Sequence, residues 1–144
     1  MDDPHDLGRF LDAQAPVFGD VVAELRAGRK RSHWMWFVFP QIAGLGSSAM
    51  ARRYAIASLA EAEAYLAHAV LGDRLRTCTD LVLAVEGRSI AAILGSPDDM
   101  KFRSCMTLFG RVAPDEARFR SALDRFYGGE PDAATLARLS SRDP

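Results

Sequence analysis

Cysteine, histidine and lysine are all scarce in this 144-residue chain, which has two cysteines, three histidines and two lysines among its 18 basic residues. Cys78 and Cys105 are too few for a disulfide framework or for a four-ligand zinc site. His5, His33 and His68 are far apart in sequence, and none is spaced from another as helical metal ligands are. We therefore expect neither a metal ion nor a cofactor.

Long hydrophobic runs are also absent. The longest uncharged stretch, residues 32–51, has 20 residues, but Pro40, Gln41, Gly44 and Gly46 interrupt it, so it is not expected to span a bilayer. The N-terminal residues are acidic and no apolar run follows them, which argues against a signal peptide. These absences predict a cytoplasmic protein with no membrane segment.

The composition is that of a folded protein. Apolar residues make up 49% of the chain and charged residues 26%, with a net charge of −1. A chain of this length buries roughly two thirds of its unfolded surface when it folds. Because no repeat, low-complexity tract or change of composition marks a boundary, residues 1–144 are expected to form a single compact domain.

The charges are distributed unevenly, since no acidic residue occurs between Leu25 and Ala60. The cations of this segment are Arg26, Arg29, Lys30, Arg31, Arg52 and Arg53. They carry +6, so the remainder of the chain carries −7. A basic segment within an acidic protein indicates an anionic partner.

Apolar residues recur at helical spacing over most of the chain, which predicts a mainly α fold. The expected helices run from Pro4 towards Pro16, from Phe18 to Gly28, from Ser58 through Leu66, from Leu71 to Gly87, from Pro97 through Phe109, from Phe119 to Gly128 and from Asp132 through Leu139. Asp3 is the expected N-cap of the first helix, Gly28 closes the second, and Ser58 forms a capping box with Glu61.

One aromatic segment, residues 34–39 (Trp34-Met35-Trp36-Phe37-Val38-Phe39), ends at Pro40 and has the length of a short buried strand. No second strand is predicted that could pair with it, and an unpaired strand would leave its backbone polar groups unsatisfied. We therefore predict that this segment is a buried helix or an extended part of the core.

Two segments of the chain carry distinctive motifs. The first is residues 28–41, with His33-Trp34-Met35-Trp36 at its centre and Gly44-Leu45-Gly46 shortly after it. The second begins at Ile93-Leu94-Gly95-Ser96-Pro97-Asp98 and continues through Lys101 to Ser104-Cys105-Met106-Thr107-Leu108-Phe109. With these motifs the chain resembles the domain of unknown function 1810 family over nearly its whole length.

The resemblance implies a mainly helical, single-domain bacterial protein with no established activity. Cys105 departs from the family pattern, which has a serine beside Ser104. Members of that family are sometimes labelled calpastatin. Calpain inhibitors of that kind are long disordered chains, whereas this sequence has the periodicity of a compact helical protein.

The first segment combines cations with aromatic residues. Arginine and lysine bind phosphate or carboxylate, and a neighbouring tryptophan or histidine can stack on a base or a sugar. The residues concerned are Arg29, Lys30, Arg31, His33, Trp34 and Trp36. The same pattern is typical of buried tryptophans beside a solvated charged loop.

Two further groups of polar residues could complete a binding site. Gly44, Gly46 and Ser48 belong to a turn whose exposed amides could bind an anion, although a plain turn followed by a helix cap explains them equally well. Lys101, Ser104 and Thr107 form one polar stripe of a helix, which could polarise a ligand or could simply face solvent or another helix.

We hypothesise that the chain binds a phosphorylated or nucleotide-like anionic small molecule, as an enzyme or as a binding protein. The candidate ligand-binding residues are Arg29, Lys30, Arg31, His33, Trp34, Trp36, Gln41, Gly44, Gly46, Ser48 and Thr107, and the catalytic candidates are His33, Lys101 and Ser104. The two segments are expected to pack through their aromatic residues, so that His33 or Gln41 lies near Lys101 or Ser104 in a pocket containing Arg29, Lys30 or Arg31.

Two alternatives remain open. Residues 26–53 could bind nucleic acid through their six cations. The protein could instead be a non-catalytic interaction module whose tryptophans are exposed at an interface.

Overall fold

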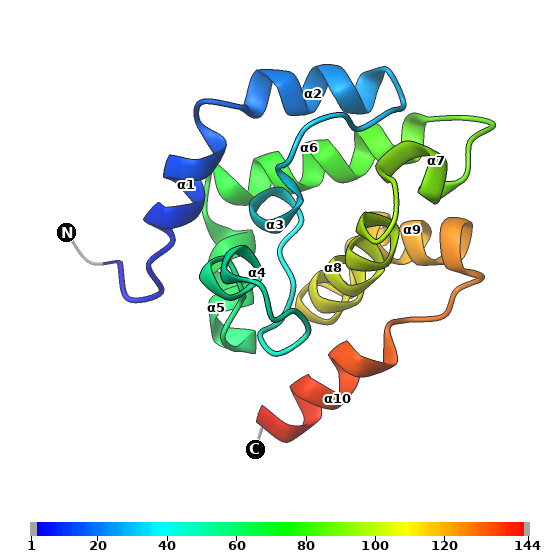
Figure 1. The fold of residues 1–144 in the computed structure, drawn as a ribbon. Helices are drawn as coiled ribbons and strands as arrows, with labels where there is room; N and C mark the ends of the chain where they lie inside the picture. Colours follow the sequence, from blue (N-terminus) through cyan, green and yellow to red (C-terminus); the bar gives the residue numbers. More distant parts are fainter. Residues whose placement is uncertain (1–2, 143–144) are drawn as a thin grey trace.

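The computed structural model describes residues 3–142, and in this range the chain forms ten α-helices and no β-sheet (Figure 1). The helices are α1 (Gly8–Gln14), α2 (Phe18–Arg26), α3 (Met35–Val38), α4 (Ala49–Arg53), α5 (Leu59–Ala67), α6 (Leu71–Ala84), α7 (Ile90–Leu94), α8 (Asp98–Val112), α9 (Ala117–Tyr127) and α10 (Ala133–Arg142). This confirms the predicted mainly α fold. The helix cap expected at Ser48 indicated α4, whereas α7 was not predicted, because five residues are too few to show a helical period.

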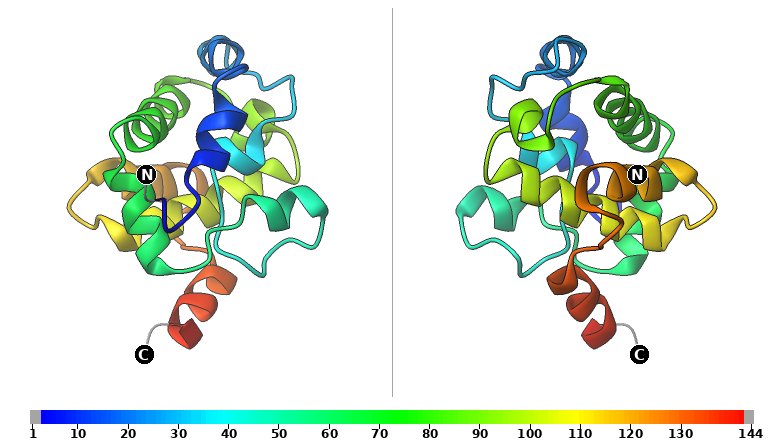
Figure 2. Two further views of the ribbon diagram at one scale, coloured as in Figure 1. Left: turned by 90° about the vertical axis from the view of Figure 1, so that its left-hand side faces the viewer. Right: turned by 90° about the vertical axis from the view of Figure 1, so that its right-hand side faces the viewer.

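The longest helix, α8, packs against α5, α7, α9 and α10, while α6 packs against α2, α5 and α9. Acidic Asp98 and Asp99 in the first turn of α8 and Arg111 in its last turn complement the helix dipole. Both views of Figure 2 show α10 at one edge of the molecule. None of the helices formed by residues 3–142 is long and apolar enough to cross a membrane.

Aromatic rings occupy the centre of the core. Phe102 on α8 meets Phe39 edge-on with ring centres 4.9 Å apart, and Phe109 lies 5.5 Å from Tyr65 and 6.2 Å from Phe119. All five side chains are at most 1% exposed. Such pairs contribute about 0.5–1.5 kcal/mol each beyond the burial of their apolar area.

The aromatic segment 34–39 contains the single-turn helix α3, so the prediction of a buried helix is confirmed. Trp34, Phe37 and Phe39 are buried, whereas Trp36 is only half-buried. A one-turn helix leaves carbonyl groups without internal partners, and here the Phe37 carbonyl accepts a hydrogen bond from the buried Gln14 side chain (2.7 Å).

The segment after α3 is fixed at both ends. The Ala43 amide donates to the Ile56 carbonyl, and the Ile56 amide donates to the Gln41 carbonyl, each at 2.8 Å. At the other end Ser48 caps α4 by accepting from the Ala51 amide at 3.1 Å. The turn-plus-cap interpretation of this segment is therefore confirmed.

The first helix begins later than predicted, at Gly8 instead of Pro4. Asp6 adopts a positive φ of 50°, which interrupts any helix that starts at Pro4. The Asp3 carboxylate still acts as a cap, because it accepts from the amides of Leu7 (2.7 Å) and Gly8 (2.8 Å).

Candidate functional site

The two distinctive segments pack against each other, as their aromatic residues predict. Besides the contact of Phe39 with Phe102, the Lys30 amide donates to the Ile93 carbonyl at 2.7 Å. The Lys30 ammonium forms an ion pair with Asp98 at 2.9 Å and lies 5.0 Å from the centre of the Trp34 ring. The Lys30 contacts fix the loop that precedes α3, and the Phe39 contact holds the loop that follows α3 against Phe102 on α8.

A cavity of about 450 Å³ lies where this loop, α8 and the start of α10 meet. Its volume is within the range of small-molecule sites, roughly 300–1,000 Å³. It is lined by Gln41, Leu45, Gly46, Ser47, Ser48, Ala51, Pro97, Met100, Lys101, Ser104, Asp132 and Ala134. We call it the loop–α8 cavity.

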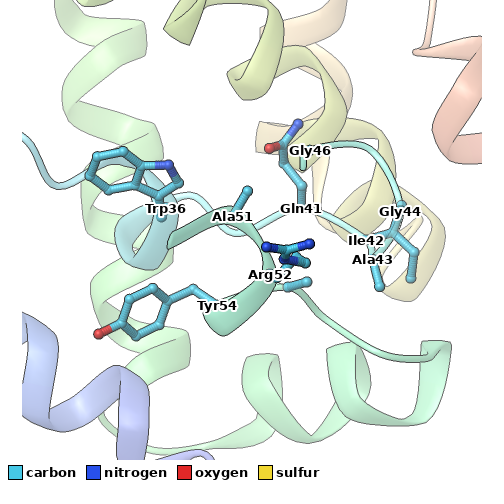
Figure 3. Close-up of a pocket in the computed structure, with 10 residues that line it drawn as sticks. Trp36, Gln41, Ile42, Ala43, Gly44, Gly46, Ala51, Arg52 and Tyr54 are labelled. Carbon is cyan, nitrogen blue, oxygen red and sulfur yellow. The ribbon is translucent and has the colours of Figure 1, made fainter. Parts of the chain in front are cut away.

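A smaller hollow of about 100 Å³ adjoins the loop–α8 cavity, and the two share Gln41, Gly46 and Ala51 in their walls. Figure 3 shows this hollow, with Trp36 and Tyr54 on the left and the segment that carries Ile42 and Gly44 on the right. Arg52 also lines it and is exposed. Because the two hollows share a wall, Arg52 is a cation near the loop–α8 cavity.

Lys101 provides positive charge in the wall of the loop–α8 cavity. Its ammonium lies 3.5 Å from the Asp98 carboxylate and 5.3 Å from the centre of the Trp36 ring. Asp98 is also paired with Lys30, so two lysines share one carboxylate. The two lysines and one carboxylate have a net charge of +1, and of the three only Lys101 lines the cavity, where it favours an anion.

Ser104 and Asp132 also line the loop–α8 cavity. The Ser104 hydroxyl lies 3.1 Å from Asp132 Oδ2 and 3.2 Å from the Met100 carbonyl. The same Asp132 oxygen accepts from the Thr135 amide (3.0 Å) and hydroxyl (2.6 Å), which caps α10. These bonds hold the carboxylate in one orientation.

The structure brings several of the sequence candidates together. Gln41, Gly46, Ser48, Lys101 and Ser104 line the loop–α8 cavity, and Trp36 and Gly44 line the adjoining hollow. Ser47 belongs to the turn of residues 44–48 that was expected to contribute, and Arg52 was named only among the cations of the basic segment. Sequence reasoning missed Asp132 as a lining residue. Asp132 was recognised only as a helix cap, because nothing in the sequence shows that α10 returns to α8.

The expectation that Arg29, Lys30 or Arg31 would line the same pocket is wrong, since none of the three lines the loop–α8 cavity or the hollow. Lys30 is held against Trp34 and Asp98 with 8% of its side chain exposed, whereas Arg29 and Arg31 are exposed.

Glu24 explains the course of the loop that carries these cations. Its carboxylate accepts from the amides of Arg31 (2.7 Å) and Ser32 (3.0 Å), from the Ser32 hydroxyl and from the Trp34 indole N–H (3.0 Å). Burial raises the pKa of Glu24, but these hydrogen bonds outweigh it and lower the pKa to about 2. The loop is thereby tied to α2.

Three further candidates lie outside both hollows. His33 is exposed, and Trp34 is buried in the core. Thr107 is buried, donates to the Arg103 carbonyl and accepts from the Asp132 amide, each at 2.8 Å, and it lines a different depression between α8 and α9. The structure therefore gives Trp34 and Thr107 packing roles.

Neither cysteine is placed for thiolate chemistry. Burial raises the pKa of the Cys78 thiol to about 12 and that of Cys105 well above its ordinary value. Cys105 is fully buried, so its position beside Ser104 in the sequence does not place it in the cavity. Among residues 3–142, no group of three or more histidine, cysteine or acidic side chains could hold a metal ion.

Comparisons with known proteins agree with the fold. Residues 4–139 match a family described as "Protein of unknown function (DUF1810)". The chain is similar to a solved structure, the conserved hypothetical protein Rv1873 from Mycobacterium tuberculosis, with 59% sequence identity and a TM-score of 0.95. That likeness covers 96% of this chain and 99% of the other. No curated protein matches.

Proposed function

This chain belongs to the DUF1810 family, described as proteins of unknown function, and we propose from its own geometry that it binds a phosphorylated small molecule in the loop–α8 cavity. One observation carries the proposal. Lys101 and Ser104 are about sixty residues from Gln41 and Ser48 in sequence, yet all four line the same cavity. Polar groups that converge in a cavity of this size are typical of a ligand site.

The polar groups of the cavity are available to a ligand. In the part of the chain that the structure describes, the side-chain amide of Gln41 and the hydroxyl of Ser47 have no protein hydrogen-bond partner. Lys101 contacts the Trp36 ring and, at 3.5 Å, a carboxylate that it shares with Lys30. A phosphate group accepts from ammonium, amide and hydroxyl donors, so all three side chains are suited to it.

The geometry supports binding and does not assign a reaction. Of the catalytic candidates, Lys101 and Ser104 line the cavity, but His33 is exposed outside it and cannot serve Ser104 as a base there. The Ser104 hydroxyl is directed to Asp132 and the Met100 carbonyl, which are structural partners within α8 and α10. The proposal is therefore a binding function.

The proposal is tested by thermal shift and by titration of intrinsic tryptophan fluorescence, because Trp36 lies beside Lys101. The probes are inorganic phosphate, glycerol 3-phosphate, ribose 5-phosphate and AMP. At least one phosphorylated probe should raise the melting temperature and change the fluorescence. Lys101→Met should weaken that binding about tenfold or more, since a hydrogen bond to a charged group contributes about 1.5–3 kcal/mol.

Arg29→Met is the matched control, because Arg29 is exposed and lies outside both hollows. It removes the same charge from the surface and should leave the affinity unchanged. Binding that is lost in Arg29→Met but kept in Lys101→Met would show that the ligand binds at the loop that carries Arg29 and not in the cavity. No response to any phosphorylated probe at millimolar concentration would refute the proposal.

A further inference from the structure

Lys101 and Asp132 place opposite charges in the wall of the loop–α8 cavity, which restricts the part of the ligand that is not phosphate. Side chains on a helix point towards its N-terminus, and the Lys101 ammonium accordingly meets Asp98 and the Trp36 ring. Asp132 meets α8 at Ser104, three residues further along the helix. A phosphate bound by Lys101 therefore does not have to contact the Asp132 carboxylate.

Asp132 has one oxygen in use and one available. Its Oδ2 accepts from the Ser104 hydroxyl and from the amide and hydroxyl of Thr135. Its Oδ1 receives no hydrogen bond from the residues that the structure describes, although Asp132 is half-buried and lines the cavity. An ionised carboxylate can only accept hydrogen bonds, so Asp132 Oδ1 requires a ligand group that donates one.

Ser104 also favours a ligand group that donates a hydrogen bond. Its single proton is directed to Asp132 or to the Met100 carbonyl, which leaves oxygen lone pairs that can accept from a ligand. A second anionic group in this position would be repelled by Asp132. Two hydroxyl groups satisfy both residues, because one donates to the carboxylate, the other donates to the Ser104 oxygen, and neither is charged.

Building on the proposed function, we infer that the ligand is a phosphorylated polyol, such as a sugar phosphate. Its phosphate binds to Lys101, Gln41 and Ser47. Its hydroxyls donate to Asp132 Oδ1 and to Ser104. The volume of about 450 Å³ is within the range of small-molecule sites.

The inference is tested by isothermal titration calorimetry with two ligands of equal length, propyl phosphate and glycerol 3-phosphate. They carry the same phosphate and differ only in two hydroxyls. Glycerol 3-phosphate should bind at least tenfold more tightly to the natural protein. In Asp132→Asn this advantage should fall to threefold or less, while the affinity for propyl phosphate stays the same or rises because a negative charge is removed.

Asparagine is itself a good N-cap, so this variant should keep α10 in place. Asp115→Asn, at an exposed position before α9, removes an equal charge outside the cavity and should change neither affinity. Equal affinities for the two ligands in the natural protein would overturn the inference and leave the proposed function standing. This holds whether or not Asp132→Asn folds. An equal loss of affinity for both ligands in a folded Asp132→Asn variant would also overturn the inference. If the natural protein binds neither ligand, the proposed function itself is refuted.

Discussion

Replacing Glu24 by alanine should destabilise the protein by about 2.5–4.5 kcal/mol at pH 7. The change removes the acceptor of four hydrogen bonds that tie the loop after α2 to that helix. The Trp34 indole N–H loses its partner while its side chain is only 1% exposed, which costs about 1–3 kcal/mol. The donors on Arg31 and Ser32 are exposed and can turn to water, so each adds only about 0.5 kcal/mol.

The loss of stability in Glu24→Ala should depend on pH. The pKa of Glu24 is lowered from 4.5 to about 2 in the folded protein, so its contribution is complete above pH 4.5 and is lost as the pH falls towards 2. The difference in unfolding free energy between the natural protein and Glu24→Ala should therefore be constant from pH 7 to pH 5 and shrink below that.

Urea unfolding at a series of pH values measures both effects, and Glu63→Ala, at an exposed position of α5, is the control. The control should change stability by no more than about 0.5 kcal/mol. A loss below 0.5 kcal/mol in Glu24→Ala, or a difference that persists unchanged at pH 2, would refute the assignment of Glu24 as the residue that holds this loop.

Three further predictions concern stability and reactivity. Lys30→Met should lower the unfolding free energy by about 2 kcal/mol in urea titrations, because it breaks a nearly buried ion pair with Asp98; a change no larger than that of Arg29→Met would contradict this. Phe102→Ala should cost about 3–5 kcal/mol, seen as a lower urea midpoint, since its ring is fully buried; a loss below 1 kcal/mol would show that this part of the core is not closely packed. Both cysteines should resist a thiol-specific chromogenic reagent at pH 8 in the native protein and react after denaturation, so rapid native labelling would contradict their burial.

Local signals in the sequence predicted most of the helices. Gly28 ends α2 with a φ of +74°, Ser58 caps α5 through the Glu61 amide, and Ser48 caps α4, all of which involve neighbours within a few residues. The packing of residues 34–39 on α8 was predicted for a different reason. Large adjacent rings must be buried, and the apolar face around Phe102 is their partner.

The direction of individual charged side chains was not predictable in the same way. Arg29, Lys30 and Arg31 are adjacent in sequence, yet only Lys30 points inward, because Asp98 and the Trp34 ring lie on that side. Asp98 is far away in the sequence, and no pattern near Lys30 reveals it. Asp132 was missed in the cavity for the same reason, because its contact with Ser104 depends on the return of α10 to α8.

The most direct test of the central claim is a ¹H–¹⁵N NMR titration of the natural protein with glycerol 3-phosphate. If the loop–α8 cavity is the binding site, saturable shifts should be confined to the amides around Gln41, Gly46, Ser48, Lys101 and Ser104. The amides of the exposed loop around Arg29 and Arg31 should not move, because that loop lies outside the cavity. Shifts centred on that loop, or no shifts at millimolar ligand, would contradict the account.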